Sequence, residues 1–423
     1  MVNFPTENAI KIMESQPINK TTDHALLPAN WLQTGQHGIG PWLLDLNQKM
    51  ESKGEEVKRH PVIIEFQELI GCDPVVRMSL TEMISQIPNK YHSHHLKSVG
   101  HMLGLLNEVL RQAPEFNHTT VVACPFSAIL IWTMGTPAGF AAYRNEKINS
   151  MFRKLLKAWG DFLNSDESLY SLNYGPHGWK CEAAQKHLKM QDYEYNPEEK
   201  YWGFKSWNDF FTRKLRQGVR PIDDPKNHKV ITGACDSTVY RICENVEKFS
   251  KFWIKSQPYS LNDMLANDDS VDQFVGGSVY QAYLNPFNYH RWHSPVTGTI
   301  KRAFVQDGLY FSQANCEGED PTDQNLSEGY ITQVQTRAII FIDCDDPSIG
   351  LACVMPVGMV EVSSCIIHDK VKPGHKVEKG DELGYFQFGG STHCIIFRPG
   401  VIKEFTAQKN KFYKMGRVIA VAN

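Results

Sequence analysis

Apolar residues recur at helical spacing through the first half of the chain. In residues 94–110 and 138–163 they return every three or four positions, so they line one face of a helix with 3.6 residues per turn. The two apolar faces consist of Leu96, Val99, Leu103, Leu106 and Leu110, and of Ile148, Phe152, Leu155, Trp159 and Leu163. Both segments are therefore predicted to be helices that pack into a core, rather than surfaces that bind a cofactor.

Proline residues indicate where further helices begin, because proline is tolerated in the first helical turn. Pro41 opens one apolar stretch, and Pro61 opens a segment that continues to about residue 70. Asp73 precedes Pro74, so a side chain that can cap a helix is followed by a favourable first residue. The helix that begins there is predicted to reach about Ile84.

Beyond residue 225 the pattern changes to short strand-like runs, and turn residues between many of them indicate a β-rich domain. The predicted strands are 230–232, 238–242, 298–300, 338–342 and 352–355. A polar stretch over residues 164–200 separates the two patterns. We therefore predict an α+β chain with an N-terminal extension (1–35), a helical N-terminal domain (36–195) and a β-rich domain (196–423).

Composition narrows the class of protein. The chain has 423 residues, of which 42% are hydrophobic, so it can bury a large core. A formal net charge of −3 provides no basic field, which disfavours binding to nucleic acid. Ten cysteines form no C-x-x-C pair, which favours reduced thiols, and the first 35 residues lack the layout of a signal peptide. We expect a cytoplasmic protein.

One segment requires a test for membrane insertion. Residues 116–143 contain no acidic residue, lysine or arginine. A membrane-spanning helix needs about 20 mainly apolar residues. Polar residues and two prolines divide this segment into shorter pieces, so it is predicted to be a buried core element.

The most informative local motif is Gly389-Gly390-Ser391-Thr392. Glycine leaves the carbonyl group of Gly390 sterically open and permits unusual backbone conformations. The hydroxyl of Ser391 is therefore placed to attack its own preceding peptide bond. The alternative is an ordinary Gly-Gly turn before a strand.

Residues far from this motif in the sequence can supply the other groups that self-cleavage needs. A nucleophilic serine requires a base, and a carboxylate that orients that base improves it. His293, in the segment Tyr289–Pro295, and Asp236 provide one residue for each role. The alternative is that His290 and His293 are ordinary histidines of a strand or turn.

A cluster of histidines earlier in the chain raises the question of a metal site. The cluster comprises His92, His94, His95 and His101. No carboxylate or cysteine lies among them to complete a familiar set of ligands. A solvated helix start is the favoured interpretation, and no metal is predicted.

From about residue 200 to its end, the chain resembles the phosphatidylserine decarboxylase family of pyruvoyl enzymes. The motifs that carry the resemblance are Trp207–Leu215 with Arg220-Pro221, Ala234–Ser237, Tyr289–Pro295, Lys379–Gly384 and Phe388–Thr392. Bacterial members have Leu-Gly-Ser where this chain has Gly389-Gly390-Ser391, and the scissile Gly-Ser bond is kept.

The resemblance implies a specific chemistry. An Asp236-His293-Ser391 triad would drive cleavage between Gly390 and Ser391, and Ser391 would become the pyruvoyl cofactor. The fragment 391–423 would stay bound to residues 1–390. We interpret His290 as the proton donor in the decarboxylation that follows. Residues 196–423 would then form the catalytic domain.

Residues 30–190 are similar to the N-terminal domain of a soluble branch of this family that includes fungal L-tryptophan decarboxylases. The matching segments include Ile64–Ile70, Ala138–Phe140 and Trp159–Leu163. This resemblance implies a lyase that decarboxylates a free, aromatic amino acid such as L-tryptophan. Two alternatives stay open: a phosphatidylserine decarboxylase that makes phosphatidylethanolamine at a membrane, and an uncleaved, non-enzymatic binding protein.

A turn near the C-terminus suggests the architecture of the β-rich domain. Residues 371–384 resemble the hammerhead turn of biotinyl and lipoyl barrels. No lysine stands at a hairpin position suited to modification. The segment is therefore expected to form a barrel-sandwich portion that serves as a scaffold.

Overall fold

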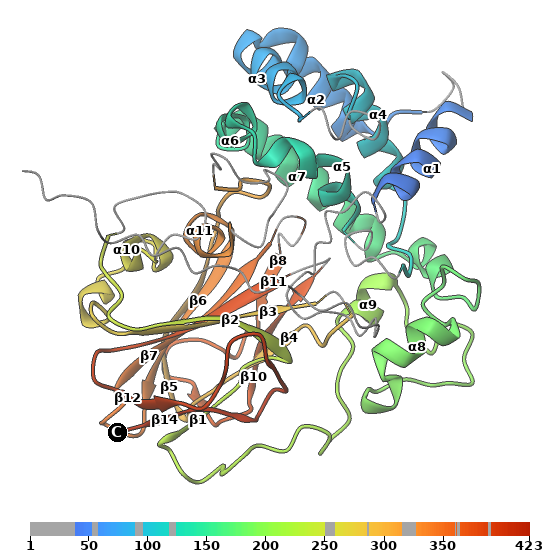
Figure 1. The fold of residues 1–423 in the computed structure, drawn as a ribbon. Helices are drawn as coiled ribbons and strands as arrows, with labels where there is room; N and C mark the ends of the chain where they lie inside the picture. Colours follow the sequence, from blue (N-terminus) through green and yellow to red (C-terminus); the bar gives the residue numbers. More distant parts are fainter. Residues whose placement is uncertain are drawn as a thin grey trace, which may run out of the picture.

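Helices form most of the N-terminal half of the protein, and strands form most of the C-terminal half (Figure 1). The computed structural model describes residues 39–52, 58–88, 96–117, 124–249, 259–285, 287–314, 327–359, 361, 364–387 and 391–423. The mixed composition and the order of the elements confirm the predicted α+β class. The predicted extension over residues 1–35 lies outside the described residues, and the domain boundary near residue 195 stays a prediction.

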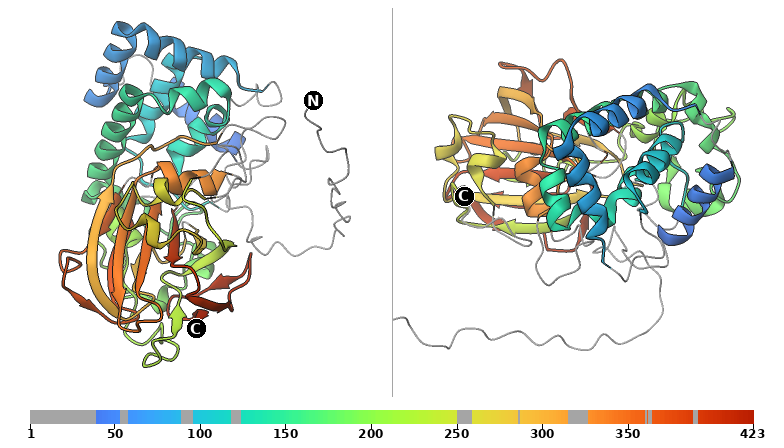
Figure 2. Two further views of the ribbon diagram at one scale, coloured as in Figure 1. Left: turned by 90° about the vertical axis from the view of Figure 1, so that its left-hand side faces the viewer. Right: turned by 90° about the horizontal axis from the view of Figure 1, so that it is seen from above.

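The helical half contains seven α-helices among the described residues, followed by short helical turns. The seven are α1 (Ile39–Ser52), α2 (Pro61–Cys72), α3 (Pro74–Ser85), α4 (Val99–Val109), α5 (Pro125–Met134), α6 (Pro137–Ala142) and α7 (Glu146–Leu163). The short elements are η4 (Asp166–Ser171), α8 (Glu182–Leu188), η5 (Met190–Asp192) and α9 (Trp207–Phe211). In Figure 1 and in the left view of Figure 2, α1 to α7 lie above the sheets.

The caps explain where these helices begin. Oδ1 of Asp73 accepts hydrogen bonds from the backbone N–H groups of Val75 (2.9 Å) and Val76 (3.1 Å), which confirms the predicted start of α3. The prediction of one helix over residues 138–163 is wrong. Asn145 caps a new helix, α7, so the segment is divided into α6 and α7.

Helix α5 contains the most apolar stretch of the helical half. Each of its residues, from Pro125 to Met134, is buried. This agrees with the prediction of a core element within residues 116–143, of which 118–123 lie outside the described residues. In the part of the chain that the structure describes, no helix is long and apolar enough to cross a membrane.

The strands form one large sheet and two small ones. The fourteen described strands are β1 (Val230–Thr232), β2 (Ser237–Cys243), β3 (Ser278–Leu284), β4 (Arg291–His293), β5 (Gly298–Gln306), β6 (Arg337–Cys344), β7 (Leu351–Gly358), β8 (Ser364–Ile367), β9 (Lys376–Val377), β10 (Glu382–Gln387), β11 (Ser391–Phe397), β12 (Ile402–Phe405), β13 (Phe412–Tyr413) and β14 (Val418–Ala422). The order in the large sheet is β13-β2-β3-β11-β7-β6-β5-β9, and the small sheets are β1-β14-β12 and β4-β10-β8. The five predicted strands are confirmed as β1, β2, β5, β6 and β7.

Short helices connect several of these strands. They are α10 (Leu261–Met264), η6 (Val271–Gln273) and α11 (Glu328–Val334). Both α10 and α11 lie on the side of the large sheet that faces the helical half (Figure 1).

Two apolar cores cover opposite faces of the large sheet. Alternate residues of a strand point to opposite faces. In β11, Cys394 and Ile396 belong to the core shared with the helices, and Ile395 and Phe397 belong to the second core. The first core runs without a break from Ile39 in α1 to β11, so the helical half and the sheet are packed together.

A buried carboxyl group also joins the two halves. Glu361, beyond the end of β7, accepts hydrogen bonds from the backbone N–H (2.7 Å) and the hydroxyl (2.6 Å) of Ser127 in the first turn of α5. Burial raises the pKa of Glu361 to about 7, although the hydrogen bonds from Ser127 oppose this shift.

Candidate active site

One end of the large sheet gathers two of the predicted site residues. Thr238 near the start of β2 pairs with Tyr283 at the end of β3, which pairs with Thr392 near the start of β11. Asp236 directly precedes β2, and Ser391 is the first residue of β11. Two strand spacings of about 4.8 Å separate β2 from β11, so these residues lie roughly 10 Å apart across the sheet.

Ser391 has an unusual environment for a polar residue. It pairs with Leu284 of β3 and Gly358 of β7, and by alternation its side chain shares the face of the second core. It is 1% exposed, and within the described part of the protein its hydroxyl has no hydrogen-bond partner. An unpaired buried hydroxyl is costly, so such a group indicates a functional role. Gly390 and the predicted scissile bond lie outside the described residues.

His290 directly precedes β4, in the segment that connects the large sheet to the small sheet β4-β10-β8. Its main-chain carbonyl accepts a hydrogen bond from Phe386 N in β10 (2.9 Å), five residues before Ser391. Its ring stacks on Phe211 with 4.0 Å between ring centroids, and neither ring nitrogen has a partner among the described residues. Burial, aided by the charge of Arg213, holds the pKa of His290 well below its usual value, although a weak interaction with the backbone of Asn288 opposes the shift. The ring is therefore neutral.

His293 is also buried, and both of its nitrogens are occupied. Nδ1 lies 2.7 Å from the carbonyl oxygen of Gly380, and Nε2 lies 2.8 Å from the hydroxyl of Tyr289. Burial raises the pKa of Tyr289, which keeps this phenol protonated and able to donate to Nε2. Nδ1–H then donates to Gly380. Burial lowers the pKa of His293, although Gly380, Glu382 and Asp236 oppose the shift.

Asp236 is held by Arg220 and not by His293. Nε of Arg220 lies 3.1 Å from both carboxylate oxygens, and Nη2 lies 2.6 Å from Oδ2. The backbone N–H of Met415 donates to Oδ1 (2.8 Å). In this structure, no hydrogen bond joins the side chains of Asp236, His293 and Ser391 in the described part of the chain. The roles of these residues therefore stay predictions.

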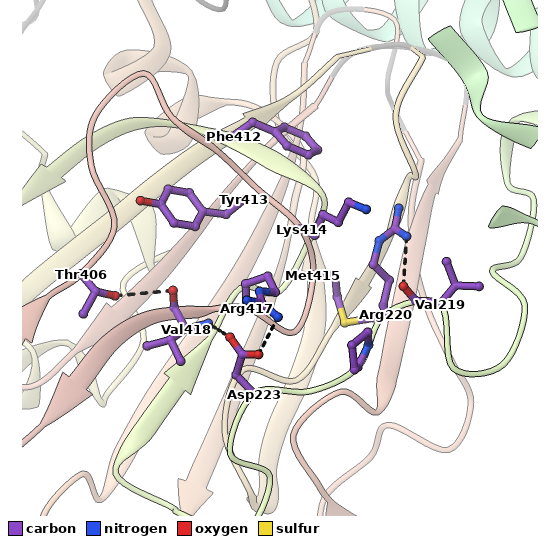
Figure 3. Close-up of a pocket in the computed structure, with 11 residues that line it drawn as sticks. Val219, Arg220, Asp223, Thr406, Phe412, Tyr413, Lys414, Met415, Arg417 and Val418 are labelled. Atoms are coloured by element: carbon purple, nitrogen blue, oxygen red, sulfur yellow. Dashed lines mark hydrogen bonds and ion pairs between the residues drawn. The ribbon is translucent and has the colours of Figure 1, made fainter. Parts of the chain in front are cut away.

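A cavity of about 780 Å³ is lined in part by Arg220 (Figure 3). It is lined by Val219, Arg220, Pro221, Asp223, Thr406, Phe412, Tyr413, Lys414, Met415, Arg417 and Val418. One wall is fixed by Asp223, which pairs with Arg417 (2.8 Å) and accepts from Val418 N (3.0 Å). The Arg220 side chain thus lines this cavity and also binds Asp236.

The structure adds residues whose role the sequence did not suggest. Tyr289 belongs to the motif Tyr289–Pro295, but nothing in the spacing of this motif indicates that its hydroxyl bonds His293. Glu328 is 1% exposed and bonds to Thr392, the residue after Ser391. It follows a polar stretch without a motif, so no sequence signal could have found it. His101 of the histidine cluster bonds Asn47 and Lys97 N, and the other three histidines lie outside the described residues.

Comparison with known proteins places the chain in a family. A family model described as phosphatidylserine decarboxylase matches residues 207–421, and a second model of the same description matches residues 60–188. The first covers nearly all the strands, and the second covers most of the helices.

Individual relatives match over most of the chain. Decarboxylase iboD of Amanita muscaria (strain Koide BX008) is 36% identical over 65% of this chain and 84% of its own length. The L-tryptophan decarboxylase of Psilocybe cubensis is 33% identical over 85% of this chain and 84% of its own length. That of Psilocybe cyanescens is 33% identical over 92% of both chains. The chain therefore belongs to the phosphatidylserine decarboxylase family and is a carboxy-lyase.

Proposed function

We propose that the protein cleaves itself between Gly390 and Ser391 and is a pyruvoyl-dependent decarboxylase of a free aromatic amino acid such as L-tryptophan. The observation that carries this proposal is the Ser391 hydroxyl, which is buried without a hydrogen-bond partner among the described residues at the head of β11. Two neutral histidines, His290 and His293, come from the segment that connects β3 to β4 and from β4 itself.

The cleavage chemistry uses only groups of the chain and water. Oγ of Ser391 bonds to the carbonyl carbon of Gly390 while His293 accepts the hydroxyl proton. The amide C–N bond breaks, its nitrogen takes the proton, and an ester replaces the amide. Loss of the α-proton of residue 391 then expels the carboxylate of Gly390. Addition of water and loss of ammonia leave a pyruvoyl group at residue 391.

The residues around Ser391 fit this group. A pyruvoyl group is neutral, and it would replace a buried hydroxyl that has no partner among the described residues. When present, the group supplies an electron sink for the departure of carbon dioxide. His290 would hold the proton that the substrate α-carbon receives, because its neutral ring retains one N–H group and neither nitrogen has a partner among the described residues.

The names of relatives support an aromatic substrate, and an aromatic stack is buried beside His290. Phe211 contacts His290, and Trp207 stacks on Phe211 with 5.1 Å between ring centroids. Two relatives are named L-tryptophan decarboxylases, which supports the same substrate class. A second candidate, decarboxylation of phosphatidylserine to phosphatidylethanolamine, is favoured by the description of the family model. Relatives that are decarboxylases leave the non-enzymatic alternative without support.

The strand pairing supports an assembly in which both fragments stay together. β11 pairs with β3 and with β7 over its seven residues, and β14 pairs with β1 and β12. Fragment 391–423 would therefore remain bound to residues 1–390 after cleavage. We also propose that β9 and β10, joined by a turn in which Gly380 has φ +90°, belong to a barrel-sandwich portion.

The proposed function is tested by two measurements on purified protein. Mass spectrometry should find a fragment that begins with a pyruvoyl group at residue 391, and carbon dioxide should be released from L-tryptophan. L-phenylalanine, L-tyrosine and phosphatidylserine vesicles complete the panel of substrates. Release from phosphatidylserine alone would select the second candidate.

Ser391→Ala provides the decisive variant, because it removes the nucleophile. It should remain one inactive full-length chain. Ser278→Ala is a matched control, since Ser278 is another buried serine of the same sheet and pairs at the far end of β11. That control should be cleaved normally. Cleavage of the Ser391→Ala chain would refute the mechanism.

A further inference from the structure

A buried polar network lies directly behind the residue that follows Ser391. Nε2 of Gln281 donates to Oε2 of Glu328 (3.0 Å) and to Oγ1 of Thr392 (3.1 Å). The hydroxyl of Tyr259 donates to Oε1 of Gln281 (2.5 Å). Each of these four side chains is at most 1% exposed. A network of this kind fixes its members because each unpaired polar group would be costly.

The network is built from separate elements that meet at β11. Gln281 belongs to β3, Glu328 opens α11, and Tyr259 precedes α10. Thr392 pairs with Tyr283 and faces the core shared with the helices, whereas Ser391 faces the opposite side of the sheet. The network therefore holds the chain at Thr392, next to Ser391, and leaves the space around the Ser391 hydroxyl free.

Counting protons indicates which form of Glu328 completes the network. The Thr392 hydroxyl has one proton but two acceptors within reach, the carbonyl of Ala282 (3.0 Å) and Oε2 of Glu328 (3.3 Å). If Glu328 is protonated, it donates to Oγ1 of Thr392, and Thr392 donates to Ala282. Thr392 then takes part in three hydrogen bonds, with Gln281, Glu328 and Ala282. Beside a charged Glu328, Thr392 can donate to only one of the two acceptors, so it takes part in two.

The surroundings of Glu328 favour the same form. Burial raises the pKa of Glu328 to about 8, although the hydrogen bond from Thr392 opposes the shift. The titratable groups that face it are Tyr283 of β3, Cys394 of β11 and Tyr259, and burial raises the pKa of each of them as well. Glu328 is therefore the group in this cluster that titrates near neutral pH.

We propose that Glu328 is a positioning residue for self-cleavage, which fixes the main chain at Ser391 through its hydrogen bond with Thr392. The proposal rests on the proposed cleavage between Gly390 and Ser391. An attacking atom must be held close to the carbonyl carbon that it attacks, and small displacements slow such steps strongly. A protonated Glu328 holds Thr392 by one more hydrogen bond than a charged one.

The test follows cleavage of freshly made precursor as a function of pH. Full-length chain from cell-free synthesis would be exchanged into buffers from pH 6 to 9.5, and the fragment 391–423 would be quantified by mass spectrometry. Wild-type cleavage should fall about tenfold from neutral pH to about one unit above the pKa of Glu328. Glu328→Gln retains an N–H donor toward Thr392 but cannot ionise, so its cleavage should not fall.

Two further variants separate this role from a merely structural one. Glu361→Gln alters another fully buried carboxyl group with a raised pKa, which bonds Ser127 instead of Thr392. It should keep the alkaline fall. Thr392→Val removes the hydroxyl that transmits the effect, so it should cleave slowly and without the fall. Near-ultraviolet circular dichroism at each pH confirms that the compared chains are folded.

The outcomes distinguish this proposal from the proposed function. An unchanged alkaline fall in Glu328→Gln, or its loss in Glu361→Gln, would overturn the role of Glu328 while Ser391→Ala still blocked cleavage. Cleavage of the Ser391→Ala chain would instead refute the self-cleavage mechanism itself. Wild-type cleavage at every pH in Thr392→Val would remove Thr392 as the link.

Discussion

The hydroxyl of Tyr289 donates to Nε2 of His293 over 2.8 Å, while Nδ1 of the same ring donates to the carbonyl of Gly380. A base that activates Ser391 must accept a proton on a free nitrogen. Nδ1 already carries its proton, so Nε2 is the nitrogen that the proposed catalysis would use. Tyr289 would therefore compete with Ser391 for the lone pair of Nε2.

This competition predicts the effect of Tyr289→Phe. Removal of the hydroxyl frees Nε2 at little cost in volume, so the precursor should be cleaved faster than the wild-type chain. The rate is measured from the decay of full-length precursor on a denaturing gel. Slower cleavage would mean that Tyr289 relays the proton or orients the ring, rather than blocking it.

Asp236→Asn should reduce both stability and maturation. The side chains of Arg220 and Asp236 are 6% and 5% exposed, so the neutral variant leaves a buried cation with a weaker partner. The free energy of unfolding should fall by up to about 3 kcal/mol. Maturation should slow because Asp236 also supports a positive charge on His293.

The stability part is measured by urea unfolding in the uncleaved Ser391→Ala chain. Asp192→Asn is the matched control, because Asp192 makes a single 3.0 Å contact with Arg220 and is 20% exposed. It should cost less than Asp236→Asn. Normal maturation of Asp236→Asn would remove Asp236 from the triad.

The two histidines of the β3–β4 region should fail in different ways. His293→Ala should accumulate uncleaved precursor. His290→Ala should be cleaved but should decarboxylate poorly, with a loss of roughly 10² to 10⁴ in turnover if His290 is a general acid. Mass spectrometry of the small fragment reports maturation, and carbon dioxide release reports turnover. If His290→Ala matured and kept full turnover, the proton donor would have to be another residue.

Acid should destabilise the protein partly through His393. This residue of β11 is fully buried, and burial lowers the pKa of its ring to about 4 from a usual value near 6.5. Between these two pH values the unfolded chain binds a proton that the folded chain does not. Stability is therefore lost as pH falls through this window, by about 3 kcal/mol in total.

His393→Leu isolates this contribution. The ring nitrogens of His393 have no hydrogen-bond partner of normal geometry in the described part of the chain, and only a weaker interaction with the backbone of Ala282 opposes the lowering of its pKa. Leucine therefore removes the titration at little cost in hydrogen bonding. Urea unfolding of both chains in the Ser391→Ala background between pH 4 and 7 should show a shallower dependence on pH for the leucine variant. Equal slopes would contradict the assignment.

Much of the fold was predictable because local pattern and tertiary packing agree in it. Short strand-like runs between turn residues predicted β5, β6 and β7, and the Asp73 cap predicted α3. The helix over residues 138–163 was predicted without its break because the apolar spacing continues across Asn145. The side chain of Asn145 nevertheless caps α7, so a new helix begins there although the apolar spacing continues.

The site was predictable only as far as its residue types. Motifs identified four candidate residues: Asp236, His290, His293 and Ser391. The hydrogen-bond partners of these residues, in contrast, are visible only in the three-dimensional structure. Arg220 lies in the segment before β1, and the fold brings this segment to the start of β2, where Arg220 binds Asp236. The spacing of the two residues in the sequence does not indicate this contact. Strand pairing over more than a hundred residues brings Thr392 to Gln281, so the network at Glu328 depends on the complete sheet.

The position of β11 in the sheet indicates that folding should precede cleavage. β11 pairs on both edges, with β3 and with β7, and the proposed cut falls immediately before it. An intact chain folds in a unimolecular reaction, whereas the cut molecule would have to reassemble from two pieces and regain the middle strand of its sheet. A cleaved chain would then be one that had already folded. After denaturation, the mature enzyme should refold poorly, whereas its intact precursor should refold well.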